Sequence, residues 1–276
     1  MILGKAISPF ALRKKSSGGG GGNDTDAQAF ITATGISGTN ATATNQLVID
    51  LKAANIWTKM KCIYPMIGGT STTCKYNLKN PVDSNAAYRL TFFGGGTFSA
   101  NGYSPGGVNG FADTFFIPST NLTDSNNHLS YYSRTDAVAA NICEIGSYDS
   151  GFRFLGIQIK YSGNLFLCAN GTNPYPTVSN TNSQGFHLMT KNGSSIQLNA
   201  FKNTTKVITN GTTGIGSSTT NVYIGAFNAN GPAANYTTKQ CAFASIGDGL
   251  TDAEALAFYN AVQTFNTTLG RQVWYN

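Results

Sequence analysis

The chain is short of charge, of glutamate and of histidine. Only 11% of its 276 residues are charged, against about 25% in an average soluble domain, so serine, threonine, asparagine and glycine must cover much of the surface. Two glutamates and two histidines leave little material for acid–base catalysis. No Ser-His-Asp or Cys-His constellation can be assembled from the residues present.

The net charge of +6 does not come from a basic stripe. Four of the eighteen basic residues, Lys5, Arg13, Lys14 and Lys15, lie in the first fifteen positions, and the others are scattered singly. Because no basic cluster alternates with aromatic residues, we expect no specific nucleic-acid binding.

The five cysteines show neither a metal-binding nor a disulfide pattern. They stand at positions 62, 74, 143, 168 and 241, an odd number without C-x-x-C spacing, which argues against a zinc site and a complete disulfide framework. Cys143 and Cys168 lie in apolar, strand-like segments, where cysteine usually acts as a small buried apolar residue. This usage favours folding in a reducing cytoplasm.

The first fifteen residues form an apolar segment with a basic end, and residues 18–22 are a flexible tether of five glycines. A secretory signal would carry its charges before the apolar part. Gly4, Ser8 and Pro9 interrupt the segment, which excludes a membrane-spanning helix and a long amphipathic one. We predict a partner-docking peptide; the alternatives are a disordered tail or cloning remnant, and a membrane-surface anchor. Its predicted contact residues are Ile2, Leu3, Ile7, Phe10, Leu12, Arg13, Lys14 and Lys15.

From residue 27 onward, short alternating apolar runs are separated by Gly/Asn/Ser clusters, the pattern of a β-sandwich or barrel. The expected strands cover residues 47–51, 88–93, 114–117, 152–161, 165–168, 185–189, 195–201, 206–209 and 221–225. Gly163-Asn164 and Asn192-Gly193 predict two hairpins, because these residues tolerate positive φ. The turn-rich stretches 94–110 and 170–184 are expected to be loops that could carry a binding surface.

One helix is predicted near the C-terminal end. Thr251 and Glu254 form a capping-box pattern, and apolar residues then recur at helical spacing until Gly270. These residues are Leu256, Tyr259, Val262, Phe265 and Leu269. The single apolar stripe predicts a helix that lies along the sandwich, on which Trp274 and Tyr275 could dock.

Several motifs of the C-terminal half occur together in one known fold. They are Phe186-His187, the Asn192-Gly193 turn, residues 196–201, 223–225 and 243–246, and the helix start at 250–254 with Tyr259. In this order they resemble the concanavalin A-like, laminin-G-type jelly roll. Residues 244–254, 263–265 and 269–273 are also similar to proteins of tailed-bacteriophage particles, crassvirus-like phages among them. The resemblance covers residues 145–273.

The resemblance implies glycan binding, which is frequent in this family, and for some members glycan hydrolysis. The hydrolases carry closely spaced acidic residues on one strand, since a retaining mechanism needs two carboxyl groups about 5 Å apart. Here Glu254 caps a helix, and the spacing of Glu144 and Asp149 places them on opposite faces of a regular strand. We therefore predict that the chain is not an enzyme.

The remaining polar candidates are isolated from one another. Asp113, Asp124 and Asp136 are too dispersed to predict the calcium site found in some relatives, and no metal or cofactor is predicted. His187 alternates with apolar residues, which favours a structural, hydrogen-bonded histidine over a ligand. His128 lies in an Asn/Ser-rich segment and is expected to be solvated.

The predicted fold is thus an all-β, concanavalin A-like jelly-roll sandwich with one C-terminal α-helix and an extended N-terminal docking peptide. The predicted domain boundaries are 1–17 for the docking peptide, 18–26 for the linker, 27–250 for the sandwich, and 251–276 for the helix and tail.

The leading functional prediction is a virion structural protein, such as a head fibre, decoration or tail-fibre component. Residues 1–15 would bind other virion proteins (capsid, portal-vertex or tail components), and the domain would self-associate, as a trimer, and contact the host surface. The alternative is a glycan-binding lectin or adhesin, with a glycoside hydrolase disfavoured. Tyr103, Tyr175 and Tyr236 lie in turn-rich segments and are the candidate glycan-binding residues.

Overall fold

The computed structural model describes residues 22–138, 142–161, 165–171, 175–193, 197–211 and 216–273. The docking peptide, with all its predicted contact residues, and Trp274 and Tyr275 lie outside the described residues. No helix in the described ranges is long and apolar enough to cross a membrane.

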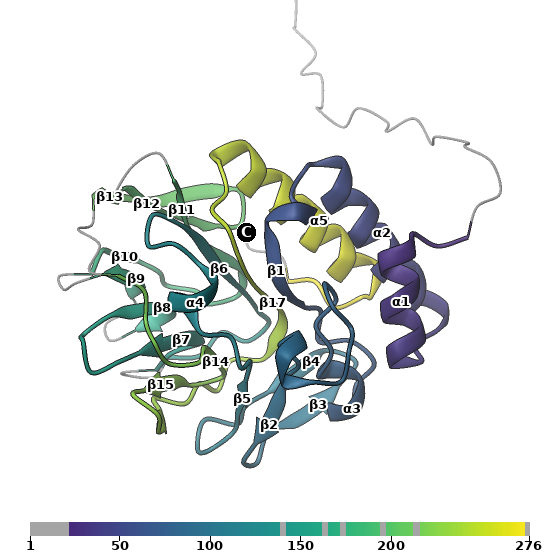
Figure 1. The fold of residues 1–276 in the computed structure, drawn as a ribbon, viewed down its shortest axis with the longest axis horizontal. Coiled ribbons are helices and arrows are strands. Elements are labelled where there is room, and N and C mark those ends of the chain that lie inside the picture. Colours follow the sequence, from purple (N-terminus) through teal and green to yellow (C-terminus); the bar gives the residue numbers. More distant parts are fainter. Residues whose placement is uncertain are drawn as a thin grey trace, which may run out of the picture.

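Two β-sheets and a group of helices form three layers (Figure 1). The helices are α1 (Thr25–Thr34), α2 (Gly38–Ala53), α3 (Ser71–Cys74), α4 (Pro118–Asn121) and α5 (Asp252–Thr268). Helices α1, α2 and α5 lie together on one side of the molecule, and the sheet that they cover separates them from the second sheet. The prediction of an all-β sandwich with a C-terminal helix is confirmed.

The middle layer, which we call the inner sheet, has the order β13-β12-β11-β6-β17-β4-β3, with β1 paired to β17. Its strands are β1 (Met60–Tyr64), β3 (Thr97–Ser99), β4 (Gly102–Ser104), β6 (Asn126–Ser133), β11 (Gly185–Asn192), β12 (Gln197–Lys202), β13 (Thr205–Gly211) and β17 (Cys241–Gly247). The pairing of β1 with β17 joins segments that are about 180 residues apart in the chain.

The second layer, the outer sheet, has the order β10-β9-β8-β7-β14-β5-β2, with β15 paired to β7 and β16 paired to β15. Its strands are β2 (Thr91–Phe93), β5 (Phe111–Asp113), β7 (Ile145–Tyr148), β8 (Phe154–Tyr161), β9 (Leu165–Gly171), β10 (Thr177–Ser179), β14 (Tyr223–Ile224), β15 (Phe227–Ala229) and β16 (Ala233–Ala234). One face of this sheet packs on the inner sheet, and the other face is free of any described layer.

The alternation of side chains along the strands builds two separate cores. On β6, Tyr131 points into the core between the two sheets, whereas its neighbour Tyr132 points into the core beneath the helices. On β8, Leu155 and Ile157 join the core between the sheets. Because side chains alternate along a strand, Phe154 and Gln158 therefore lie on the opposite, outward face of the outer sheet.

Helix α5 begins as predicted, because Thr251 and Glu254 form both hydrogen bonds of the capping box. The strand predicted for residues 47–51 is wrong, since these residues belong to α2. The buried residues of α2 include Ala43, Leu47 and Leu51, four residues apart, and packing of this stripe outweighs the strand propensity of the local sequence. Residues 25–53, which were predicted to lie mostly in the sandwich, thus form two helices.

The strand predicted for residues 114–117 is also wrong. The carboxylate of Asp113 accepts a hydrogen bond from the backbone N–H of Phe115 at 2.7 Å, and Phe115 has φ +56°. This turn ends β5 after Asp113. In residues 88–93 only Thr91–Phe93 is a strand, and the predicted loops 94–110 and 170–184 contain the short strands β3, β4 and β10.

The remaining predicted strands all correspond to strands in the structure. Strands β11 and β12 pair antiparallel as the predicted hairpin, and Gly193 has φ +82°. The turn predicted at Gly163-Asn164 lies outside the described ranges, although β8 and β9 pair antiparallel on either side of it. Cys143 is buried, as predicted.

The two histidines are both buried in the inner sheet. His187 is structural, as predicted: Nδ1 lies 3.2 Å from the carbonyl oxygen of Gly185. The prediction that His128 is solvated is wrong, because its ring nitrogens contact the Asp248 carbonyl at 2.6 Å and the Ser245 hydroxyl at 3.0 Å. Burial lowers the pKa of His128 to about 4 and that of His187 to about 3, so both rings are neutral.

Candidate functional site

The structure separates the three tyrosines that were predicted to bind glycans. Tyr103 is fully buried between the sheets, so this prediction is wrong. Tyr236 is half-buried on the outer sheet, where its hydroxyl donates to the Ala233 carbonyl at 2.9 Å. Tyr175 lines a cavity on the outer sheet.

That cavity, which we call the aromatic basin, lies on the outward face of the outer sheet and has a volume of about 350 Å³. Five of its seven lining residues are aromatic. The lining residues are Tyr148, Phe154, Gln158, Tyr161, Tyr175, Phe227 and Asn235. They come from β7, β8 and β15 and from the segments beside β10 and β16. Figure 1 shows β7, β8, β10 and β15 together at one end of the molecule.

Strand register places the rings. Tyr148 of β7 lies directly opposite Phe154 of β8, so both side chains stand on the same face. Strand β15 runs parallel to β7 on its other side and brings Phe227 to 4.8 Å from Phe154 and 5.8 Å from Tyr148, measured between ring centroids. Tyr175 meets Phe154 edge-on at 5.1 Å. Mutual packing therefore holds the walls of the basin in place before any ligand arrives.

Gly156 on β8 leaves the space that the ring of Phe154 occupies. A Cβ atom at Gly156 would lie 2.4 Å from the ring of Phe154. Since no side chain at position 156 competes for this space, the Phe154 ring lies flat along its own strand, with only 7% of the residue exposed.

The polar groups of the basin have no hydrogen-bond partner within the described part of the chain. The hydroxyls of Tyr148, Tyr161 and Tyr175 and the side-chain amides of Gln158 and Asn235 make no hydrogen bond to any described residue. Burial, reinforced by the nearby Tyr148 hydroxyl, raises the pKa of Tyr175, so its hydroxyl stays protonated and can donate. The basin thus combines apolar ring surface with uncharged groups that donate and accept hydrogen bonds.

The two acidic residues considered for hydrolysis lie elsewhere. Glu144 is fully buried and accepts hydrogen bonds from the Ile159 N–H at 2.6 Å, the Thr237 hydroxyl at 2.9 Å and the Lys239 ammonium at 3.1 Å. These three hydrogen bonds hold the Glu144 carboxylate inside the folded structure, and Glu144 does not line the basin.

Asp149 stabilises the turn after β7. Its carboxylate accepts hydrogen bonds from Arg153 and from Thr219. Burial alone would raise the pKa of Asp149, but these hydrogen bonds prevail and lower it to about 2. Asp149 is therefore an ionised structural group, and neither acidic residue is available to a ligand in the basin.

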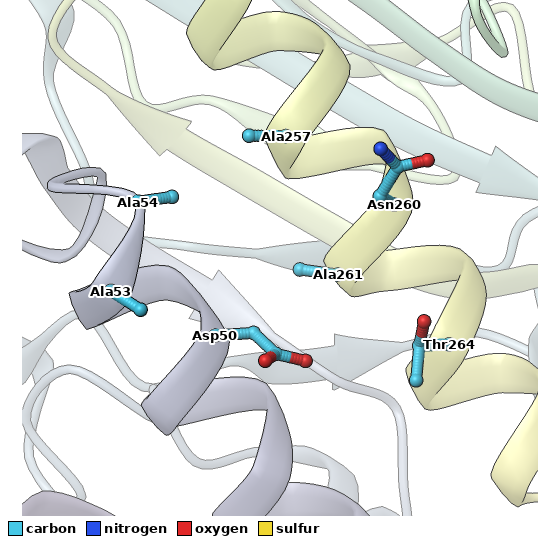
Figure 2. Close-up of a pocket in the computed structure, with 7 residues that line it drawn as sticks. All are labelled: Asp50, Ala53, Ala54, Ala257, Asn260, Ala261 and Thr264. Atoms are coloured by element: carbon cyan, nitrogen blue, oxygen red, sulfur yellow. The ribbon is translucent and has the colours of Figure 1, made fainter. Parts of the chain in front are cut away.

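Two further cavities are lined mainly by residues that are not aromatic. One, of about 440 Å³, lies between α2 with its C-cap and α5; Figure 2 shows the short alanine side chains of the two helices facing each other across it. Its lining residues are Asp50, Ala53, Ala54, Ala257, Asn260, Ala261 and Thr264. The other lies beside β13 and α5, with a mostly polar wall that includes Lys202 and Thr205. The described residues contain no group of three or more side chains that could hold a metal ion.

Most of the basin was not predicted from the sequence. Phe154 and Gln158 lie in the alternating run of residues 152–161, which identified the strand but not its outward face. Phe227 and Asn235 belong to a segment without a strong strand pattern, and only the register of β15 against β7 brings them to the site.

Comparisons with known proteins bear on the fold. No family model matches the chain, and no curated protein matches it. A mutant of Trypanosoma rangeli sialidase displaying trans-sialidase activity aligns with 80% of this chain and 39% of its own length, at 11% identity and a TM-score of 0.56.

Two weaker similarities cover 48% of this chain. They are to the NanB sialidase of Streptococcus pneumoniae, over 23% of that chain at 11% identity and TM-score 0.39, and to the CBM40 of Ruminococcus gnavus IT-sialidase bound to α2,3-sialyllactose, over 80% of that chain at 15% identity and TM-score 0.37. The chain spans less than half the length of the sialidases that it matches. At these identities the first similarity shows the fold alone, an all-β sandwich as the sequence predicts.

Proposed function

We propose that the protein is a glycan-binding, lectin-like module and that the aromatic basin is its binding site. The observation that carries the proposal is one cavity with five packed aromatic rings and five uncharged polar groups that make no hydrogen bond to a described residue. Ligand sites are typically preformed, mostly apolar concavities with a few convergent polar groups.

The chemistry of a sugar suits both parts of this wall. A pyranose ring has apolar C–H faces, which an aromatic ring covers, and a rim of hydroxyl groups that both donate and accept hydrogen bonds. Tyrosine supplies the two kinds of contact from one side chain, because its ring is apolar and its hydroxyl is polar. The sandwich fold supports the proposal, since the jelly-roll family that the sequence resembles includes many glycan binders.

Glycan-array binding of the full chain tests the proposal. We expect wild-type protein to retain a set of glycans, and Tyr175→Ala and Phe227→Ala each to weaken binding about tenfold, which corresponds to about 1.4 kcal/mol. The matched control is Tyr236→Ala, which removes a half-buried tyrosine of the same sheet outside the basin. A wild-type protein that binds no glycan, or basin variants that bind like the control, would contradict the proposal.

The virion role predicted from the sequence is compatible with this function and is a second proposal. The apolar segment 1–15 and the glycine tether support it, since the segment is suited to binding a particle and the tether to connecting it flexibly to the domain. In this proposal the chain assembles in the bacterial cytoplasm, binds virion proteins through its docking peptide, and presents the basin to the host surface.

A further inference from the structure

We infer that the aromatic basin selects uncharged sugars and excludes acidic ones such as sialic and uronic acids. The inference rests on the proposed glycan-binding function and goes further, because it names the class of ligand. The inferred ligand class differs from the ligand of the Ruminococcus gnavus CBM40, which is bound to sialyllactose.

The described wall of the basin carries no charge. None of the seven described lining residues is charged. A carboxylate bound in the basin would therefore have no opposite charge on the wall, whereas proteins that recognise carboxylates usually provide arginine or lysine.

The cations closest in sequence to the lining residues of β8 already have partners. Arg153 forms an ion pair with Asp149 at 2.9 Å, and Lys160 forms one with Asp136 at 2.9 Å. An acidic sugar could recruit either cation only by breaking its existing pair. Taking a carboxylate out of water without a partner is strongly unfavourable, so the basin discriminates against it.

The side-chain amide of Gln158 suits sugar hydroxyls better than a carboxylate. This residue is only 7% exposed, yet its side-chain amide lines the basin and makes no hydrogen bond to a described residue. A primary amide offers two donors and one acceptor oxygen, which match a pair of sugar hydroxyls. A carboxylate could only accept hydrogen bonds from the N–H donors and would offer no donor to the amide oxygen.

The test is an array of paired oligosaccharides, each printed once in neutral form and once with a terminal sialic or uronic acid. We expect the wild-type protein to bind neutral members at least tenfold more tightly than their acidic partners. Titration calorimetry of the best neutral ligand should give the same affinity in about 0.05 M and 0.5 M NaCl, since salt screens only interactions between charges.

Three variants test which side chains determine the selectivity. Gln158→Glu adds a carboxylate without changing shape and should weaken neutral binding at least tenfold at pH 7.5. Tyr175→Phe keeps the ring and removes one hydroxyl, so it should weaken binding several-fold while folding normally, and a thermal melt of each variant checks the fold. Arg153→Gln is the control for hidden charge recognition and should leave the preference for neutral members unchanged.

Failure of the selectivity and failure of the glycan-binding function give different results. Preferential binding of acidic members that is lost in the basin variants, or strong weakening by salt, overturns the selectivity and leaves the glycan-binding function intact. Absence of any glycan binding, or binding that Tyr175→Phe and Gln158→Glu do not alter, overturns the function itself.

Discussion

The buried ion pair between Glu144 and Lys239 gives a sharp prediction about stability. Both side chains are fully inaccessible to solvent, and Nζ lies 3.1 Å from the carboxylate. Glu144→Gln removes the negative charge and one acceptor oxygen while keeping the shape. The Lys239 ammonium then has no charged partner in the core, and removing one member of a buried pair typically costs about 3–5 kcal/mol.

This loss is large enough to measure by thermal unfolding. For a domain of roughly 150–250 residues each 1 kcal/mol lowers Tm by about 2–4 °C, so we expect Glu144→Gln to lower Tm by about 6–20 °C. Lys239→Met should cost a similar amount. The double variant should cost clearly less than the sum, with a coupling energy of about 0.5–3 kcal/mol, because it leaves no unpaired charge.

An exposed ion pair serves as the control for this experiment. Asp83→Asn breaks the contact between Asp83 and Lys75, in which the aspartate side chain is 46% exposed, and should cost at most about 1 kcal/mol. Single variants of Glu144 or Lys239 that shift Tm by no more than this control, or a double variant with fully additive losses, would refute the reasoning. Glu144→Gln should also leave the release of reducing sugar from host polysaccharides unchanged, since we predict no hydrolysis.

Four further predictions concern other parts of the chain. Because burial depresses the pKa of His128 to about 4 and of His187 to about 3, the unfolded chain binds protons below about pH 6.5 while the folded one does not. Stability should therefore fall as the pH drops from about 6.5 to 4, by up to about 2.7 kcal/mol per pH unit, and urea melts that do not change over this range would contradict it. Thr251→Ala breaks the capping box of α5 and should cost about 1 kcal/mol, whereas Thr264→Ala, exposed on the same helix, should cost less; equal losses would count against the cap. Deleting residues 1–17 should preserve Tm and abolish incorporation into particles, and normal incorporation would rule out the docking peptide. Light scattering should give three times the 29.1 kDa chain mass, and a monomer mass would rule out self-association.

The sequence predicts elements well where one local signal dominates. The capping box of α5 is complete within four residues and is found where it was predicted. Residues 47–51 carry conflicting signals, because a β-branched run favours a strand while the apolar spacing from Ala43 to Leu51 suits a helix. Only packing on the inner sheet decides between them, and packing is a property of the whole fold.

The candidate site shows the same limit. Tyr103 and Tyr175 lie in equally turn-rich sequence, yet one is buried between the sheets and the other lines the basin. The difference depends on which face of which strand each residue occupies, and strand order cannot be read from local composition. The basin itself arises from the pairing of β15 with β7, about 80 residues apart in the chain.

Arg271 connects segments that leave the ribosome at very different times, so the fold is completed only late in synthesis. Its buried guanidinium donates hydrogen bonds to the carbonyl oxygens of Pro65, Met66 and Ala242, and Asn266 accepts another. On a ribosome adding about 5–20 residues per second, at least ten seconds separate the emergence of Pro65 from that of Arg271. During this interval the inner sheet also lacks β17, the neighbour of β1. A nascent chain stalled before residue 241 would leave β1 and β6 without their neighbour β17, and such unpaired strand edges are sites of aggregation.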